Sequence, residues 1–153
     1  MTEPFVRKAR PEDLPAIVAM LADDALGSTR EDVGPPLNPA YAEAFAAIDR
    51  DPNQFMAVLD EAGEAVGYLQ LTFIPGLSLR GMLRGQIESV RVASSRRGSG
   101  LGRRMFEWAI AECRRRGCGM VQLTMNKSRG EALRFYERLG FVASHEGFKL
   151  PLG

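Results

Sequence analysis

Apolar residues along this chain form short strand-like runs in some segments and recur at helical spacing in others. The order of these two kinds of segment predicts an α/β fold. Strand-like runs occur at Phe5–Ala9, Phe55–Leu59, Val66–Ile74, Gln86–Val92 and Met120–Met125, with two short runs at Phe141–Ala143 and Phe148–Leu150. Apolar residues three and four positions apart mark helices after Pro11, through Tyr41–Ile48, over Leu101–Arg116, and from about Arg129 to a stop at Gly140. This order of elements predicts a mixed sheet that is covered by helices on both faces.

Interruptions in the apolar pattern predict where the loops lie. Gly27–Pro39 has no period and contains a Gly-Pro-Pro sequence, so it is expected to be a loop. Asp60–Ala65 contains a glycine between two strand-like runs, which indicates a β-hairpin. Because there is no internal repeat, low-complexity tract or linker, we expect residues 1–153 to form a single domain.

The composition of the chain argues against several classes of binding partner and of cysteine chemistry. The chain has 153 residues, is 45% hydrophobic and carries a net charge of +1, which argues against a general nucleic-acid binder or a membrane-surface protein. It has no apolar run near the ~20 residues of a membrane span and no signal-peptide pattern, so we expect a cytoplasmic protein. Cys113 and Cys118 are too few and wrongly spaced for a disulfide framework or a zinc site, and no metal is expected.

A glycine- and arginine-rich loop follows the strand-like run that ends at Val92. It reads Arg96-Arg97-Gly98-Ser99-Gly100-Leu101-Gly102-Arg103-Arg104 and leads directly into a helix. Glycines let main-chain N–H groups approach a ligand, and a helix N-terminus attracts anions. Neither the P-loop nor the dinucleotide-binding pattern fits, because Arg103 stands where the first requires lysine and the second requires glycine. Amides flanked by four arginines therefore favour a polyanion, most simply a pyrophosphate.

The pattern that does fit is [Q/R]-x-x-G-x-[G/A], which is met by Arg97, Gly100 and Gly102. Downstream, residues 132–141 read Ala-Leu-Arg-Phe-Tyr-Glu-Arg-Leu-Gly-Phe. With these two motifs in this order and spacing, the chain resembles the GNAT superfamily of acyl-CoA-dependent N-acyltransferases. The resemblance is specific over residues 86–141. It implies acetyl-CoA as the acyl donor and a mostly antiparallel central sheet of six to seven strands, with a splayed pair of parallel strands at the cofactor cleft.

The resemblance also implies roles for individual residues. The backbone of Val90, Arg91 and Val92 would pair with the pantetheine arm of acyl-CoA, and Tyr136 would protonate the leaving thiolate. The pyrophosphate would be held by the main-chain N–H groups of Arg97, Gly98, Ser99, Gly100, Leu101, Gly102 and Arg103. An alternative for Tyr136 is an amphipathic core residue beside Phe135.

Glu88 is the carboxylate that is best placed in the sequence to act as a general base, one strand residue before the stretch that pairs with pantetheine. The alternative is an exposed strand residue that forms an ion pair with Arg91 or Arg84, or a base step carried by an ordered water. Substrate choice is expected to lie with Gly27–Pro39 and with the connection between Ile74 and Arg84.

One departure from the family pattern concerns the segment before the second motif. Family members often have an asparagine that touches the cofactor arm at the place occupied here by Arg129, and Asn126 lies three residues earlier. A branch that acts on small amines, including aminoalkylphosphonate acetyltransferases, is similar in this respect. Asn126 and Arg129 are therefore expected to contact the cofactor, although Arg129 could instead bind the substrate or cap the last helix. His145, the only histidine, has no assigned role.

The sequence thus predicts an enzyme that acetylates the primary amine of a small molecule with acetyl-CoA. Two alternatives stay open: a catalytically silent acyl-CoA-binding regulatory module, and an acetyltransferase of proteins or peptides. A binder of another nucleotide is a third. Nothing in the sequence identifies the amine, the length of the acyl group or the oligomeric state, although pairing into a homodimer is common in the family.

Overall fold

A computed structural model describes residues 2–153, which form two compact parts. The first part extends to Val121 and contains most of the sheet, and the second covers Gln122–Gly153. Among residues 2–153, no helix combines the length and apolarity that crossing a membrane requires.

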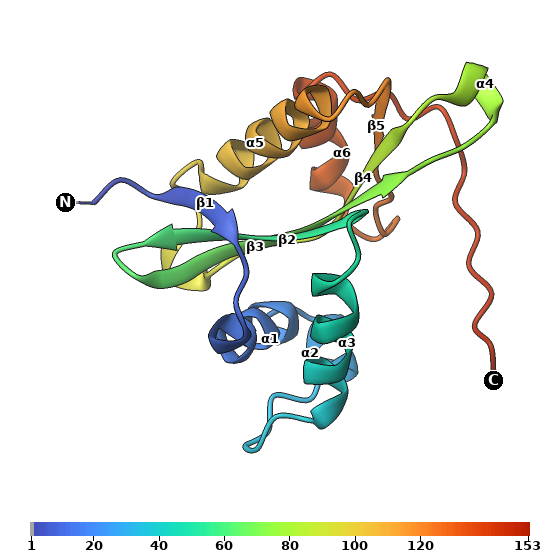
Figure 1. The fold of residues 1–153 in the computed structure, drawn as a ribbon. Helices are drawn as coiled ribbons and strands as arrows, with labels where there is room; N and C mark the ends of the chain where they lie inside the picture. Colours follow the sequence, from blue (N-terminus) through green and yellow to red (C-terminus); the bar gives the residue numbers. More distant parts are fainter. Residues whose placement is uncertain (1) are drawn as a thin grey trace. The chain divides into compact units, whose positions relative to one another are not determined.

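A five-stranded sheet forms the centre of the fold (Figure 1). Its strands are β1 (Phe5–Lys8), β2 (Gln54–Glu61), β3 (Glu64–Ile74), β4 (Arg84–Val92) and β5 (Met120–Gln122), in the order β1-β2-β3-β4-β5. The first four strands pair antiparallel. The N–H of Gly119 donates to the carbonyl of Leu83 (2.9 Å), which places the start of β5 beside the start of β4. A parting of these two strands beyond their first residues stays a prediction.

The expectation of six to seven strands is wrong. Phe141–Ala143 and Phe148–Leu150 are not strands, and the strand expected to reach Met125 ends at Gln122. A strand exists only when its backbone groups pair with a neighbouring strand, and in the chain that the structure describes these short segments have no such ladder. Apolar composition alone was therefore an insufficient signal.

Helices cover both faces of the sheet in the first part, as predicted. In Figure 1, α1, α2 and α3 lie on one face and α5 lies on the other. The bounds are α1 (Leu14–Ala22) after a 3₁₀ turn at Pro11–Asp13, α2 (Gly27–Arg30), α3 (Pro39–Asp49), α4 (Ser78–Gly81), α5 (Leu101–Arg115) after a 3₁₀ turn at Ser94–Arg96, and α6 (Gly130–Arg138) in the second part. Leu79 and Arg80 have positive φ, so α4 is a local turn rather than an α-helix.

Side-chain oxygens accept hydrogen bonds from N–H groups at the start of two of these helices. Asn38 accepts a hydrogen bond from the N–H of Ala40 (3.0 Å), and a proline follows Asn38 at the first helical position of α3. The N–H of Gly27, the first residue of α2, donates to Oδ1 of Asp24 (2.5 Å). The prediction of a loop throughout Gly27–Pro39 is wrong for its first four residues, because they form this short helix, whose first N–H finds its partner outside the predicted segment.

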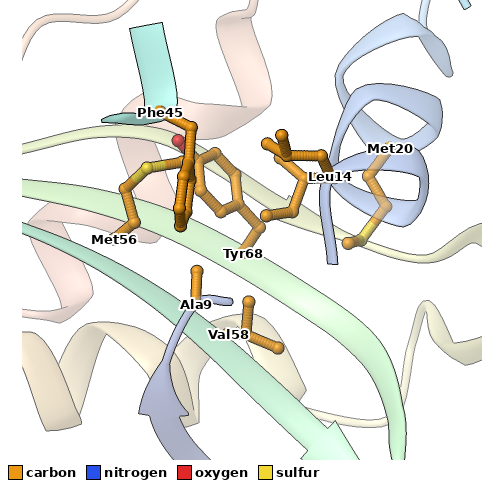
Figure 2. Packing of buried hydrophobic residues seen from close by; sticks show 8 residues of the cluster. Ala9, Leu14, Met20, Phe45, Met56, Val58 and Tyr68 are labelled. Carbon is orange, nitrogen blue, oxygen red and sulfur yellow. The ribbon is translucent and has the colours of Figure 1, made fainter. Parts of the chain in front are cut away.

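Two hydrophobic layers hold the helices against the sheet. Figure 2 shows the layer beneath α1 and α3, in which Phe45 and Leu14 pack with Met56, Val58 and Tyr68 of the strands. On the other face, α5 is close to β3: a Cβ at Gly67 would lie 2.7 Å from the sulfur of Met105. The glycine permits this close approach. The position of α5, and hence of the loop that leads into it, therefore depends on packing against the central strands.

A buried ion cluster joins β1 and the turn before α1 to β2, with Arg7 and Asp60 lying 53 positions apart in the sequence. Arg7 of β1 contacts Asp60 of β2 (Nε to Oδ2, 2.8 Å) and Asp13 (Nη1 to Oδ2, 2.8 Å; Nη2 to Oδ1, 2.9 Å). Both carboxylates are buried. The hydrogen bonds from Arg7 hold the pKa values of Asp13 and Asp60 below the ordinary range, against the opposing effect of burial. This cluster fastens the first strand and the first helix to the β2–β3 hairpin.

Candidate functional site

A β-bulge interrupts β4 at the point where the candidate site begins. Tyr68 pairs with Arg91 and Gln70 pairs with Glu88, so that one residue of β3 faces two residues of β4, Ser89 and Val90. Ser89 has φ +58°, which is uncommon for a residue other than glycine. A bulge increases the local twist and takes backbone groups out of the ladder. Sequence reasoning missed this feature, since no glycine marks it.

Beyond the bulge, the glycine loop presents main-chain N–H groups at the start of α5. Gly98 and Gly100 both have φ +80°, and a Cβ at either position would meet nothing within 4 Å. The N–H of Arg104 donates to the carbonyl of Gly100 (3.1 Å) at the start of the helix. The N–H groups of residues 101–103 come before that bond, so the helix itself supplies no partner for them. Amides at a helix N-terminus with open space in front of them suit an anion.

The arginines of the loop are less available than the sequence indicated. Each of the four contacts a carboxylate: Arg96 with Glu61 (2.6 Å), Arg97 with Asp23 (3.2 Å), Arg103 with Glu107 (2.9 Å) and Arg104 with Glu3 (3.0 Å). The pairs of Arg97, Arg103 and Arg104 are exposed, and such pairs contribute only about 0–1 kcal/mol. The guanidinium groups are thus engaged with carboxylates, whereas the main-chain amides at the start of α5 have open space in front of them.

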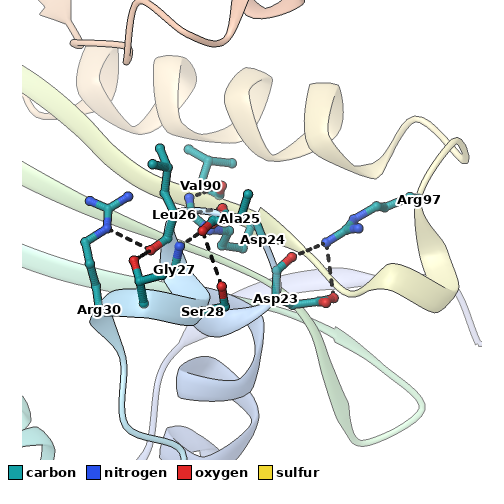
Figure 3. Close-up of polar contacts among 11 residues, drawn as sticks. Asp23, Asp24, Ala25, Leu26, Gly27, Ser28, Arg30, Val90 and Arg97 are labelled. Carbon is teal, nitrogen blue, oxygen red and sulfur yellow. Dashed lines mark hydrogen bonds and ion pairs between the residues drawn. The ribbon is translucent and has the colours of Figure 1, made fainter.

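Two of the predicted cofactor residues also hold the connection between α1 and α2 (Figure 3). Arg97 donates from Nη2 to the main-chain oxygen (3.1 Å) and to Oδ2 (3.2 Å) of Asp23. Arg91 donates to the carbonyl of Val90 (3.0 Å), and its Nη2 lies 3.6 Å from Oδ2 of Asp24. Asp23 and Asp24 lie three to four residues before Gly27, where the segment expected to select the substrate begins. Ion pairs thus link the glycine loop and β4 to the residues that lead into that segment.

Glu88 lies exposed on β4, next to the bulge. Thr72 of β3 donates a hydrogen bond from Oγ1 to Glu88 Oε1 (3.4 Å). Burial, and to a lesser extent the charge of Glu88, raises the pKa of Tyr68, so that phenol stays neutral beside the strand. The carboxylate of Glu88 is therefore accessible beside the bulge, and its role as the base stays a prediction.

In the second part of the chain, a turn and an aromatic cluster position the remaining predicted residues. Asn126 Oδ1 accepts hydrogen bonds from the N–H (3.0 Å) and the Oγ (2.7 Å) of Ser128, and this turn places Arg129 immediately before α6. Tyr136 is half-buried, with its ring edge-on to Phe135 (5.6 Å between centroids) and to Phe141 (6.1 Å). The structure therefore groups the predicted residues into two sets, one in each part of the chain.

His145 is exposed, and its Nδ1 lies 2.6 Å from the hydroxyl of Ser144. Among the described residues, no group of three or more histidine, cysteine or acidic side chains could hold a metal ion. The burial of the Cys113 thiol raises its pKa to about 12, so it stays protonated at neutral pH.

Comparison with known proteins identifies relatives over most of the chain. Residues 18–141 match the model of the acetyltransferase (GNAT) family. The aminoalkylphosphonate N-acetyltransferase of Salmonella typhimurium is 33% identical over 113 residues, which cover 74% of this chain and 73% of that protein. The L-methionine sulfoximine/L-methionine sulfone acetyltransferase of Pseudomonas paraeruginosa is 30% identical over 142 residues, which cover 91% of this chain and 80% of that protein.

A solved structure extends the similarity to the whole fold. The crystal structure of a transcriptional regulator from Bacillus halodurans C-125 is 46% identical in sequence and superposes with a TM-score of 0.95, covering 98% of this chain and all of that one. The region matched by the family model, residues 18–141, includes the bulge in β4, the glycine loop and α6. The predicted site residues therefore lie inside the matched region.

Proposed function

Because the chain belongs to the GNAT family of acetyltransferases, we propose that it transfers an acetyl group from acetyl-CoA to the primary amine of a small molecule. Two curated relatives support a small acceptor, since their names give an aminoalkylphosphonate and methionine sulfoximine or sulfone as substrates. The acceptor of this chain is proposed to be selected by the segment Gly27–Pro39 and by the connection between Ile74 and Arg84. The second of these leads directly into β4, the strand that carries Glu88.

The observation that carries the proposal is the open row of amides between the bulge and α5. The N–H groups from Arg97 to Arg103 are proposed to bind the diphosphate of acetyl-CoA, with the dipole of the 15-residue helix α5 adding to the attraction. The backbone of Val90–Val92 is proposed to pair with the amides of the pantetheine arm, as an added strand would. The bulge supports this contact, because it interrupts the hydrogen-bond ladder between β3 and β4 at the start of that stretch.

The proposed chemistry starts with a protonated amine. An alkyl amine has a pKa of about 10.4, so only about one molecule in 10³ is the nucleophilic free base at pH 7. Glu88 is proposed to take the proton, directly or through a water molecule. The neutral nitrogen then attacks the thioester carbonyl, the C–N bond forms and the C–S bond breaks, and the second proton that the nitrogen loses as it becomes an amide passes to solvent, from which Tyr136 is reprotonated after it has donated to the thiolate. Such proton transfer typically contributes about 10²–10⁴-fold to the rate.

Tyr136 is proposed to return a proton to the leaving thiolate. A phenol with a pKa near 10 can protonate a thiolate whose conjugate acid has a pKa of about 8.5 when the two are in hydrogen-bond contact. Its ring contacts with Phe135 and Phe141 limit its motion, which supports a defined position for the hydroxyl. Asn126 and Arg129 are proposed to contact the cofactor from the turn before α6.

The test measures release of free CoA with a thiol reagent across aminophosphonates, amino acid analogues, amino sugars, polyamines and peptides. We expect turnover with at least one small amine, and we expect Tyr136→Phe to lower kcat by about 10-fold or more while the Kd for acetyl-CoA changes little. Equal activity of Tyr136→Phe and the wild type would remove Tyr136 from the mechanism.

The second candidate function is a regulatory module that binds acyl-CoA without turnover. The observation that favours it is the 46% sequence identity to a Bacillus halodurans protein whose crystal structure is described as that of a transcriptional regulator. At 100 times its Kd, acetyl-CoA stabilises the folded state by about 2.7 kcal/mol under either candidate, which corresponds to roughly 5–11 °C in Tm. Stabilisation without CoA release from any amine would favour the module, and no stabilisation would contradict both.

A further inference from the structure

A row of polar side chains crosses one face of the sheet and ends at Glu88. Gln70 and Thr72 of β3 alternate with buried apolar residues along that strand. Thr72 pairs with Gln54 of β2 on one side, and Gln70 pairs with Glu88 of β4 on the other. Alternate residues of a strand, and residues directly opposite each other in neighbouring strands, point to the same face. These four residues, named here the polar row, therefore share one face, and all lie in the first part of the chain.

Hydrogen bonds join the side chains of the polar row. Nε2 of Gln70 donates to Oε1 of Gln54 (3.0 Å). The hydroxyl oxygen of Thr72 lies 2.9 Å from the same Oε1 atom and 3.4 Å from Oε1 of Glu88. At the other end, the hydroxyl of the buried Tyr68 lies 3.5 Å from Oε1 of Gln70. A continuous chain of contacts therefore leads from a buried phenol to the predicted base.

The phenol sets the direction of the hydrogen bonds in this chain. Burial raises the pKa of Tyr68, so its hydroxyl keeps its proton and can donate to the side-chain oxygen of Gln70. The amide of Gln70 then turns its NH₂ group toward Gln54, whose side-chain oxygen is the acceptor. A carbonyl oxygen has two lone pairs, so the oxygen of Gln54 can accept from Thr72 as well. The hydroxyl of Thr72 therefore has an acceptor on either side.

A single hydroxyl proton can serve only one of these two acceptors at a time. When Glu88 is charged, the hydroxyl of Thr72 can donate to the carboxylate, while Gln54 still accepts from Gln70. When Glu88 carries a proton, the hydroxyl can donate to Gln54 and accept from the carboxylic acid. The polar row thus offers Glu88 a hydrogen-bond partner in both protonation states, which suits a group that must take up a proton and release it again.

We propose that Thr72 is a positioning residue for Glu88, an inference that rests on the proposed function. Its hydroxyl donates to the carboxylate before the reaction. The N–H bond of the ammonium group then breaks, and the proton passes to Glu88 directly or through a water molecule. The hydroxyl of Thr72 turns to Gln54 and accepts from the new carboxylic acid, which later gives its proton to solvent. Thr72 itself touches neither the acceptor nor acetyl-CoA and acts only by orienting the carboxyl group.

The first test is a double-mutant cycle in the CoA-release assay. Thr72→Val removes the hydroxyl, and valine is branched like threonine and favours strands, so the fold should be kept. We expect kcat to fall about tenfold, because a hydrogen bond to a charged group is lost, while KM for acetyl-CoA stays within about twofold. Thr72→Ser is the matched control, since it keeps the hydroxyl and should recover most of kcat. In the Glu88→Gln background, Thr72→Val should have no further effect, because the charged partner is already gone.

Three kinetic results would overturn the inference. They are full activity of Thr72→Val, a change in KM alone, and the same loss of kcat in the wild-type and Glu88→Gln backgrounds. The last result would mean that Thr72 acts through another group. The Tm of every variant, measured by calorimetry, controls for loss of folding, and Thr72→Ala replaces Thr72→Val in the cycle if the valine variant does not fold.

A measurement on the free protein separates this inference from the proposed function. The carbon-13 resonance of the Glu88 carboxyl group is assigned by its absence in Glu88→Gln and is recorded at neutral pH. We expect it to move in Thr72→Val and to return toward its wild-type position in Thr72→Ser. An unmoved resonance overturns the inference, whether or not an acceptor has been found. A moved resonance without CoA release from any amine would instead contradict the proposed function.

Discussion

Replacing Gly102 by alanine is expected to stabilise the protein and, at the same time, to weaken its binding of acetyl-CoA. Gly102 lies in the first turn of α5 with ordinary helical geometry. A Cβ there would approach only Val92, at 3.9 Å from Cγ2, which is an ordinary van der Waals contact. Alanine is favoured over glycine in a helix by about 0.5–1 kcal/mol, so we expect Tm to rise by roughly 1–4 °C.

The effect on binding has the opposite sign, because the new methyl group lies where the diphosphate is proposed to sit. In an α-helix the Cα–Cβ bond tilts toward the N-terminus, and for Gly102 that direction leads into the open space in front of the amides of residues 101–103. Displacing a phosphate from one such amide removes a hydrogen bond to a charged group, which contributes about 1.5–3 kcal/mol. We therefore expect the Kd for acetyl-CoA to increase about tenfold or more, as measured by calorimetry.

Gly100→Ala provides the comparison that separates stability from binding. Gly100 has φ +80°, which costs an alanine about 1–2 kcal/mol, so this variant should melt at a lower temperature. Its Cβ also enters open space in front of the loop, so we again expect weaker binding. If Gly102→Ala binds acetyl-CoA as tightly as the wild type, the amides of the first turn do not hold the diphosphate and the reasoning is refuted.

Three further predictions follow from the ion pairs. Arg7→Met leaves two buried carboxylates unpaired and should cost about 3–5 kcal/mol, or roughly 6–20 °C in Tm by calorimetry, whereas Lys8→Met, which breaks an exposed pair, should cost at most about 1 kcal/mol. Equal losses would contradict the buried cluster. Since Arg7 lowers the pKa values of its two carboxyl partners, their contribution to stability is complete above the unfolded pKa of about 3.9 and disappears as pH falls through the lower folded pKa, which urea unfolding at several pH values would detect. Asp23→Asn should free Arg97 for the diphosphate and lower the Kd for acetyl-CoA by up to about fivefold; weaker binding would show that the pair supports the site.

Local patterns were sufficient for most elements of the fold. The β2–β3 hairpin and the start of α5 at Leu101 lie where the sequence predicted them. Periodicity, turn residues and helix stops act over a few neighbouring positions, so they can be read from the chain alone. The glycine loop was identified for the same reason, because its predicted role rests on consecutive main-chain amides rather than on side chains brought from elsewhere.

Features that depend on distant segments were not predictable in this way. The bulge at Ser89 exists only because of the register between β3 and β4, and no residue type marks it. The cluster around Arg7 joins residues 53 positions apart, and the carboxylate partners of the loop arginines come largely from other elements. Apolar runs near the C-terminus looked like strands, but a strand needs a partner whose position a local pattern does not specify.

The sequence by itself determined the family resemblance, the glycine loop before α5 and the order of most helices and strands, because each is encoded by neighbouring residues. Only the tertiary structure decided that Arg96, Arg97 and Arg104 pair with carboxylates of distant segments, that β4 is bulged beside Glu88, and that the apolar runs after α6 form no strand within the described chain. The physical reason is that hydrogen-bond ladders and ion pairs form between segments whose separation in space is set by the packing of the whole fold.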